Sequence, residues 1–252
     1  MRFDIVTIFP RMIESALAEG ILARGMQRGL LTVRARDLRE FTDDRHRTVD
    51  DVPYGGGPGM VLKPEPMFRA VEAIERDIGL PEAVVLVSPQ GRRFSQHEAA
   101  RLGALSHVVI LCGRYEGIDD RVRQHLATEE LSVGDYVLSG GELPALVIVD
   151  AVARLIPGVV GDEDSVAGDS FSRGLLDFPH FTRPAEFRDW KVPDVLISGH
   201  HGEIRKWRKR RALELTAGRR PELLAEAELD VEEQGILREL MEQKKGAAHG
   251  RD

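Results

Sequence analysis

The sequence predicts an α/β protein: a mainly parallel β-sheet covered by helices, followed by a smaller, mostly helical domain. Two observations predict this class. Short β-branched runs alternate with helical patterns through roughly the first 155 residues, and strand-like runs disappear after about Leu175. Alternating strands and helices are typical of a parallel sheet, whose ligands bind in loops at the carboxyl ends of the strands.

The elements expected in the first part follow in chain order. Each strand-like run is bounded by Pro, Gly or Ser, and the helix candidates between them carry apolar residues at helical spacing. The strands are Phe3–Phe9, Ala83–Val87 and Val108–Cys112, and the helices are Pro10–Ala18, Pro66–Ile78 and Ser95–Leu105. Ser95 stands three residues before Glu98, the spacing of a capping box at the start of a helix.

A further helix is expected over Leu143–Ile156, and its residues are apolar nearly all round. Such a helix is buried either in the core or in a subunit interface. The texture then changes to a stretch rich in Gly, Asp and Ser, and later to the helical segments Glu203–Thr216, Pro221–Leu224 and Val231–Gln243. We therefore expect domains at 1–160 and 175–246, a flexible linker at 161–174 and a disordered tail at 247–252.

Composition excludes several classes of protein. The chain has 252 residues, of which 42% are hydrophobic and 31% charged, so it is not a wholly disordered protein. Its single cysteine, Cys112, excludes an internal disulfide and a Cys-rich zinc site. No apolar run reaches the ~18 residues of a membrane span, and the N-terminus does not resemble a signal peptide. We expect a cytoplasmic protein without a membrane partner.

Charge is unevenly distributed along the chain. The whole sequence carries a formal net charge of −7, which argues against a general polyanion binder. The segment Glu203–Arg220 nevertheless holds eight basic residues against two acidic ones, a local charge of +6, with Trp207 among them. A dense basic segment with an aromatic residue suits phosphate contacts and base stacking, so it predicts an RNA-binding helix rather than a merely solvated basic face.

Glycine is concentrated in three clusters, at 54–60, 112–117 and 134–142. Each could be a tight turn, but three clusters in one α/β domain favour binding loops, because glycine lets the backbone approach a ligand closely. None of them matches the Rossmann or Walker A pattern. The residues that follow the glycines are Tyr, Val, Leu, Pro and Glu, which suit a flat aromatic ligand such as an adenine.

Five sequence motifs closely resemble the bacterial tRNA (guanine-N1)-methyltransferase family of the SPOUT superfamily. They are Tyr54-Gly55-Gly56-Gly57-Pro58-Gly59-Met60, Leu111-Cys112-Gly113-Arg114-Tyr115-Glu116-Gly117-Ile118-Asp119, Gly134-Asp135-Tyr136-Val137-Leu138-Ser139-Gly140-Gly141-Glu142-Leu143-Pro144, the stretch from Asp169 to Pro184 that contains Pro179-His180-Phe181-Thr182-Arg183, and Ile204-Arg205-Lys206-Trp207-Arg208. The resemblance extends from the first strand to about residue 224. Their shared order and spacing make chance improbable.

The resemblance implies a homodimer with its active site at the subunit interface. The first domain would contain a deep trefoil knot that binds S-adenosyl-L-methionine, and the second would bind tRNA. General folding rules alone predict an unknotted sheet. The implied reaction methylates N1 of guanosine 37, next to the anticodon and after G36, with Mg²⁺ as a possible requirement. Another SPOUT enzyme acting on rRNA or ribose 2′-O, and a catalytically silent RNA-binding protein, are the alternatives.

The resemblance also assigns roles to individual residues. Asp169 becomes the general base, Arg154 stabilises the guanine oxygen, and Glu116 contributes to the donor and guanine pocket. Read without the resemblance, these three are a solvated or helix-capping acid, a cation at a helix C-terminus and a surface acid. Because the substrate nitrogen is itself the nucleophile, Cys112 is expected to be a packed, inert residue.

The remaining assignments concern binding. No metal ligands are assigned, since His200 and His201 lack a third ligand at sensible spacing. The residues assigned to the methyl donor are Leu86, Ser88, Pro89, Gly113, Tyr115, Glu116, Val133, Gly134, Asp135, Tyr136, Val137, Leu138, Gly140, Gly141 and Pro144. The residues assigned to RNA are His46, Asp50, Pro58, Gly59, Ser165, His180, Arg183, Gly199, Arg205 and Arg208.

Overall fold

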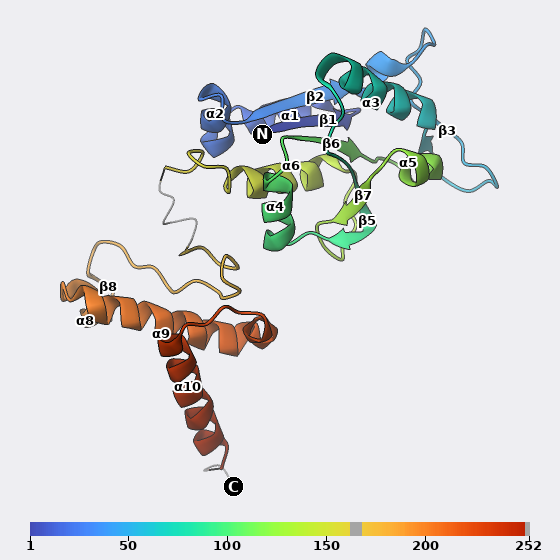
Figure 1. Cartoon of the computed structure of the whole chain (residues 1–252). Coiled ribbons are helices and arrows are strands. Elements are labelled where there is room, and N and C mark those ends of the chain that lie inside the picture. The colour runs from blue at the N-terminus through green and yellow to red at the C-terminus, as the bar shows by residue number, and fades with distance from the viewer. Residues whose placement is uncertain (162–167, 250–252) are drawn as a thin grey trace. The chain divides into compact units, whose positions relative to one another are not determined.

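The computed structural model describes the backbone of residues 1–161 and 168–249. The chain divides into two compact units, Met1–Glu163 and Asp164–Asp252 (Figure 1). The linker predicted at 161–174 and the tail predicted at 247–252 lie partly outside the described residues. In the part of the chain that is described, no helix combines the length and apolarity that a membrane crossing requires.

The first unit is built on a five-stranded sheet with the order β2-β1-β6-β5-β7, and all neighbouring pairs are parallel. Its strands are β1 (Arg2–Thr7), β2 (Thr32–Asp37), β5 (Ala83–Arg93), β6 (His107–Cys112) and β7 (Glu129–Ser132). The predicted α/β class and the three predicted strands are confirmed. The strands β2 and β7 at the two edges were not predicted, and β5 continues beyond Val87 through a bulge.

Helices cover both faces of this sheet (Figure 1). One face packs against α1 (Pro10–Leu17), α2 (Gly20–Gln27), α4 (Gln96–Gly103) and α6 (Glu142–Ala153). The other packs against the 3-10 turn η1 (Leu38–Phe41), α3 (Pro64–Ile78) and α5 (Asp120–His125). Side chains of β1 alternate between the two cores, with Phe3 and Ile5 in the first and Val6 in the second. Burial on both faces explains the continuous apolar runs of the central strands.

Two helix predictions need refinement. Ser95 caps α4 by accepting a hydrogen bond from the Glu98 N–H at 3.4 Å. The Glu98 carboxylate, however, pairs with Arg92 and Arg101, so only half of the capping box forms. The helix α6 buries one face in the core, while Leu143 and Val147 on its other face are 51% and 50% exposed. The helix is apolar nearly all round because one of its faces packs in the core and the opposite face carries an exposed apolar stripe that includes Leu143 and Val147.

The second unit is mostly helical, as predicted. It contains α8 (Asp194–Ile197), α9 (His201–Arg219), the 3-10 turn η2 (Pro221–Ala225) and α10 (Val231–His249). A small antiparallel hairpin of β8 (Glu186–Phe187) and β9 (Trp190–Lys191), which the sequence analysis did not predict, precedes them. Leu175, Leu213 and Ile236 form the centre of a small core that joins α9 to α10.

Candidate functional site

The three glycine-rich clusters converge in the first unit. A short hairpin of β3 (Asp50–Asp51) and β4 (Val61–Leu62) carries the first loop, the second follows β6, and the third connects β7 to α6. The Gly141 N–H donates to the Gly113 carbonyl at 2.9 Å, and the Glu116 N–H donates to the Met60 carbonyl at 3.0 Å. Loops that are far apart in the sequence thus form one site at the carboxyl ends of β6 and β7.

A cavity of about 470 Å³ opens between the second and third loops and β5. Of the residues assigned to the methyl donor, it is lined by Leu86, Ser88, Pro89, Gly113, Tyr115, Glu116, Val133, Gly134, Tyr136, Val137, Leu138, Gly140, Gly141 and Pro144. Asp135, in the third loop, does not line it. Arg114, Ile118, Ser132 and Ser139 line it as well, although the sequence analysis did not single them out.

Close backbone packing explains why glycine occupies the floor of the cavity. A Cβ atom at Gly141 would lie 2.6 Å from Val87 Cγ2 and 2.7 Å from Cys112 Cα. Since φ of Gly141 is −82°, the requirement is one of space and not of backbone conformation. A Cβ atom at Gly140 would overlap the Arg114 side chain. The third loop can therefore lie against β5 and β6 only because it has no side chains there.

Two residues of the second loop stand at the rim of the cavity. Tyr115 has a φ of 60°, a left-handed conformation that is uncommon for a side chain of its size, and it is 53% exposed. The exposed Glu116 carboxylate packs directly against Gly59 of the first loop, where a Cβ atom would overlap it. The two RNA candidates Pro58 and Gly59 therefore lie beside a donor candidate.

The buried Cys112 lies directly beneath this loop. Its side chain is 1% exposed, and burial, reinforced by the nearby Glu142 carboxylate, raises the pKa of its thiol well above the ordinary value. A buried thiol of raised pKa is a poor nucleophile. This environment agrees with the predicted role of a packed, inert cysteine.

The catalytic candidates Arg154 and Asp169 belong to different units. Arg154 is the half-buried C-cap residue that follows α6, and its N–H donates to the Asp150 carbonyl at 3.1 Å. It lines a shallow groove along the exposed face of α6, which shares Val133, Tyr136, Leu138 and Pro144 with the cavity. Asp169 is half-buried in the second unit. Ser165 lies outside the described residues.

The two remaining RNA candidates of the first unit precede the first loop. His46 is exposed, and its N–H donates to Asp44 Oδ1 at 2.9 Å. Asp50 is half-buried in β3, where it pairs with Leu62 of β4. They share a segment with Pro58 and Gly59.

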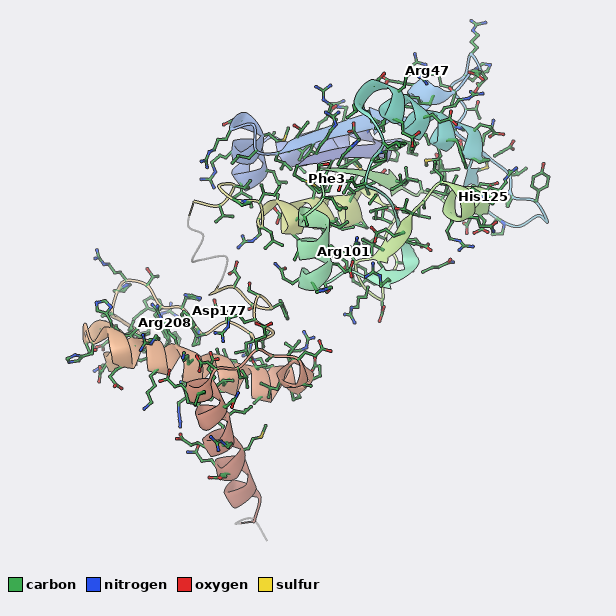
Figure 2. The ribbon with its side chains drawn as sticks, in the orientation of Figure 1. Phe3, Arg47, Arg101, His125, Asp177 and Arg208 are labelled. Carbon is green, nitrogen blue, oxygen red and sulfur yellow. The ribbon has the colours of Figure 1, made fainter. Side chains whose placement is uncertain are left out.

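In the second unit, four RNA candidates gather around one groove of about 570 Å³, between the segment 178–183 and α9. They are His180, Arg183, Arg205 and Arg208. Arg208 belongs to α9 (Figure 2). Its guanidinium lies 4.9 Å from the centroid of the Phe178 ring, and the rings of Phe181 and Trp207 are 6.3 Å apart. Gly199 does not line the groove but precedes α9 with a φ of +76°. The groove combines cations with partly exposed aromatic rings.

Other basic residues of α9 are neutralised within the unit. Lys209 Nζ lies 2.6 Å from Asp230 and 2.7 Å from Glu232, and Arg210 Nη2 lies 3.0 Å from Glu239 of α10. No ion pair of Arg205 or Arg208 occurs among the described residues. Two of the cations counted along the sequence, Arg205 and Arg208, thus line the groove without an acidic partner among the described residues. A charge count within 203–220 does not reveal these acidic partners, because they lie at the start of α10 or within it.

In residues 1–161 and 168–249, no three His, Cys, Asp or Glu side chains come together in a way that would hold a metal ion.

Known proteins resemble this chain over nearly its whole length. The family model described as "tRNA (Guanine-1)-methyltransferase TrmD" matches residues 1–226. A tRNA (guanine-N(1)-)-methyltransferase from Pelotomaculum thermopropionicum is 55% identical over 96% of both chains, and one from Geobacillus kaustophilus is 52% identical over 95% of this chain and 98% of the relative. The crystal structure of the tRNA (m1G37) methyltransferase from Aquifex aeolicus superposes with a TM-score of 0.74 and 40% identity, covering 89% of this chain and 95% of that one.

Proposed function

This chain belongs to the tRNA (guanine-N1)-methyltransferase family, and from that membership we propose that it methylates N1 of guanosine 37 in tRNA, next to the anticodon and after G36, with S-adenosyl-L-methionine as donor. The observation that carries the proposal is a cavity lined by two glycine-rich loops, one of which is hydrogen-bonded to the third such loop. The similar Aquifex aeolicus protein is a tRNA (m1G37) methyltransferase, which supports position 37 on the tRNA.

The cavity suits the methyl donor. Its volume of about 470 Å³ lies within the range of small-molecule sites. Leu86, Leu138 and Pro144 offer apolar contacts to a flat adenine, and the floor at Gly141 lets backbone groups reach a ligand without an intervening side chain. When bound, the donor supplies an electrophilic methyl group on a positively charged sulfur. The residues of the second and third loops, with those of β5, bind it and exclude water from it.

Methyl transfer to guanine N1 makes three demands on the protein. The N1 proton must be accepted, and we assign this role to the Asp169 carboxylate as general base. Negative charge that develops on O6 must be stabilised, and the Arg154 guanidinium supplies a cation for it. The target base must leave its stack to reach the donor. No protein nucleophile is required, which is consistent with the burial of Cys112.

The tRNA interface in this proposal is the groove face of α9. Arg205 and Arg208, with His180 and Arg183, supply cations for phosphates, and the rings around them supply stacking surfaces. The cations paired to α10 are already satisfied and contribute less. Further contacts come from Ser165, Gly199, His46, Asp50, Pro58 and Gly59.

The proposed active form is a homodimer in the cytoplasm. The exposed apolar stripe of α6, with Leu143 and Val147, supplies a surface that a second copy would cover. One subunit would contribute the donor cavity, built on a deep trefoil knot, and the other its Asp169 and helical tRNA-binding domain, joined through the linker. We place the donor-binding domain at residues 1–160, the linker at 161–174, the tRNA-binding domain at 175–246 and the tail at 247–252.

A labelling experiment tests the proposal. Labelled S-adenosyl-L-methionine is incubated with the protein and an unmodified tRNA transcript that carries guanosine 37 or a substituted base. We expect label only with guanosine 37, and N1-methylguanosine on nucleoside analysis. Equal labelling of both transcripts would refute the position. A ribose-methylated product, or label transferred only to rRNA, would instead identify another SPOUT activity.

A variant separates catalysis from binding. Asp169→Asn should lower kcat on the order of 10²- to 10⁴-fold, because the proton acceptor is lost, while donor and tRNA still bind. Glu186→Gln, which removes an exposed acid of the second unit that pairs with Lys191 at 3.6 Å, serves as the matched control and should keep its turnover. Absence of any binding heat with the donor in the wild type would favour a catalytically silent RNA-binding protein.

A further inference from the structure

A buried acid stands at the entrance to α6, and the proposed reaction gives it no role. The side chain of Glu142 is 0% exposed. Its Oε1 accepts a hydrogen bond from Thr7 Oγ1 at 2.7 Å, and its Oε2 accepts one from Arg114 Nε at 2.9 Å. Thr7 lies at the end of β1, and Arg114 lies in the loop after β6. One carboxylate therefore connects three separate segments of the first unit.

Arg114 extends these connections. Its backbone forms an isolated antiparallel bridge with Gly140, and its Nη1 lies 3.4 Å from Ser139 Oγ in the third loop. The guanidinium also lies 4.6 Å from the centroid of the Phe9 ring. The side chain is only 15% exposed, so these contacts are made largely out of water. A charge-assisted contact of fixed direction is strongest in such surroundings.

The segments joined by this pair are opposite walls of the donor cavity. Gly113, Tyr115 and Glu116 belong to one wall, and Leu138 and Gly140 belong to the other. Both walls are rich in glycine, and such loops do not hold a fixed separation by themselves. A planar guanidinium that contacts both loops and is anchored on a buried carboxylate supplies the missing rigidity.

We propose that Arg114, Glu142 and Thr7 are positioning residues that fix the separation of the two cavity walls, and thereby the affinity for the methyl donor. The inference rests on the proposed function, because it takes the cavity to be the donor site. These residues act through the loops that they hold. Loss of the contacts among Arg114, Glu142 and Thr7 widens the cavity and weakens donor binding, whereas the tRNA-binding groove of the second unit is unaffected.

The test uses the full chain and paired substitutions. Replacing Arg114 alone would leave a buried carboxylate without its cation, which threatens folding. The double variant Arg114→Met/Glu142→Gln removes both charges and keeps side chains of similar size. Arg114→Lys keeps the charge but loses the planar fork. Arg121→Met, which removes an exposed arginine paired with Asp119 at 2.8 Å, is the matched control.

Calorimetric titration with S-adenosyl-L-methionine and steady-state kinetics give the readouts. We expect the double variant to raise the donor Kd and the KM for donor on the order of 10- to 100-fold, since a displacement of about 1 Å is enough for such a loss. Arg114→Lys should recover part of the affinity. The tRNA Kd should remain at the wild-type value in every variant, and Arg121→Met should match the wild type throughout.

Each outcome decides the inference. A double variant that unfolds at the wild-type temperature and binds donor with wild-type affinity overturns it. If the double variant does not fold, Thr7→Val removes one hydrogen bond to Glu142 at constant shape, and an unchanged donor Kd there overturns it as well. A wild-type protein that binds no donor would contradict the proposed function instead.

Discussion

Substitution of Gly141 by alanine gives a sharp test of the cavity floor. The added Cβ atom would lie 2.6 Å from Val87 Cγ2 and 2.7 Å from Cys112 Cα, whereas carbon atoms pack at about 3.5–4.0 Å. The start of α6 must therefore move by about 1 Å, because a Cβ atom meets the backbone of the buried central strand β6 there. Overpacking of this kind costs about 1–3 kcal/mol. For a unit of this size, the melting temperature should fall by about 2–12 °C.

The same displacement reaches the donor. Gly141 and its neighbour Gly140 line the cavity, so a shift of about 1 Å changes its shape at the floor. We expect the donor Kd to rise at least tenfold, with kcat for methyl transfer reduced on the order of 100-fold. Thermal unfolding followed by circular dichroism measures the first effect. Calorimetric titration with S-adenosyl-L-methionine and single-turnover methylation measure the second.

Gly103→Ala is the matched control. This glycine ends α4 in the same unit, and a Cβ atom there would meet Val152 Cγ1 at an ordinary 3.6 Å. Alanine should be neutral or stabilise the helix by up to about 1 kcal/mol. If both variants melt with the wild type and bind donor equally well, the close approach at Gly141 and the reasoning built on it are wrong.

Three further predictions concern charge and reactivity. Arg205→Ala/Arg208→Ala should weaken tRNA binding and reduce the slope of log affinity against log salt by about two, as measured by filter binding, whereas Lys209→Ala should change this slope less. Burial opposes ionisation of Asp4, but hydrogen bonds from Arg2 and Arg36 outweigh it and hold the pKa of its carboxyl below the ordinary 3.8. The stability that the ionised Asp4 contributes is thus present at pH 7 and is lost as the pH falls below about 4, so the difference in melting temperature between the wild type and Asp4→Asn should narrow there; a constant difference would contradict this. Cys112 should react with a thiol reagent at pH 8 only after unfolding, and Cys112→Ala should retain turnover; rapid labelling of the native protein would contradict its assigned burial.

The strands and helices that were predicted correctly are those whose buried residues form a clear apolar pattern within the element's own sequence. β6 is buried at every position and reads as a continuous apolar run. β2 was missed because only Val33 is buried in it, and its Arg36 is stabilised by Asp4 on the neighbouring strand, a contact that no local pattern signals. β7 was missed because four residues at a sheet edge carry too little periodicity.

For the site, the sequence indicated where ligands bind but not what holds the site together. The rule that loops follow the carboxyl ends of strands applies to the loop after β6, and the family resemblance selected most of the cavity residues. The pair of Arg114 and Glu142 joins positions 28 apart and was not foreseen. Which basic residues of α9 are neutralised depends on acids at and within α10, a helix that comes later in the chain. The sequence of α9 alone therefore could not separate Lys209 and Arg210, which are paired, from Arg205 and Arg208, which line the groove.

The bond between Thr7 and Glu142 has a consequence for biosynthesis, because its partners are 135 positions apart in the chain. A ribosome delivers the first strand long before the start of α6, so a growing chain cannot close the pocket until more than half of the protein has been made. All five strands of the sheet precede Glu142 in the chain, so completion of the pocket follows their synthesis. Donor binding by chains released at successive lengths would date that event and would report completion of the native topology.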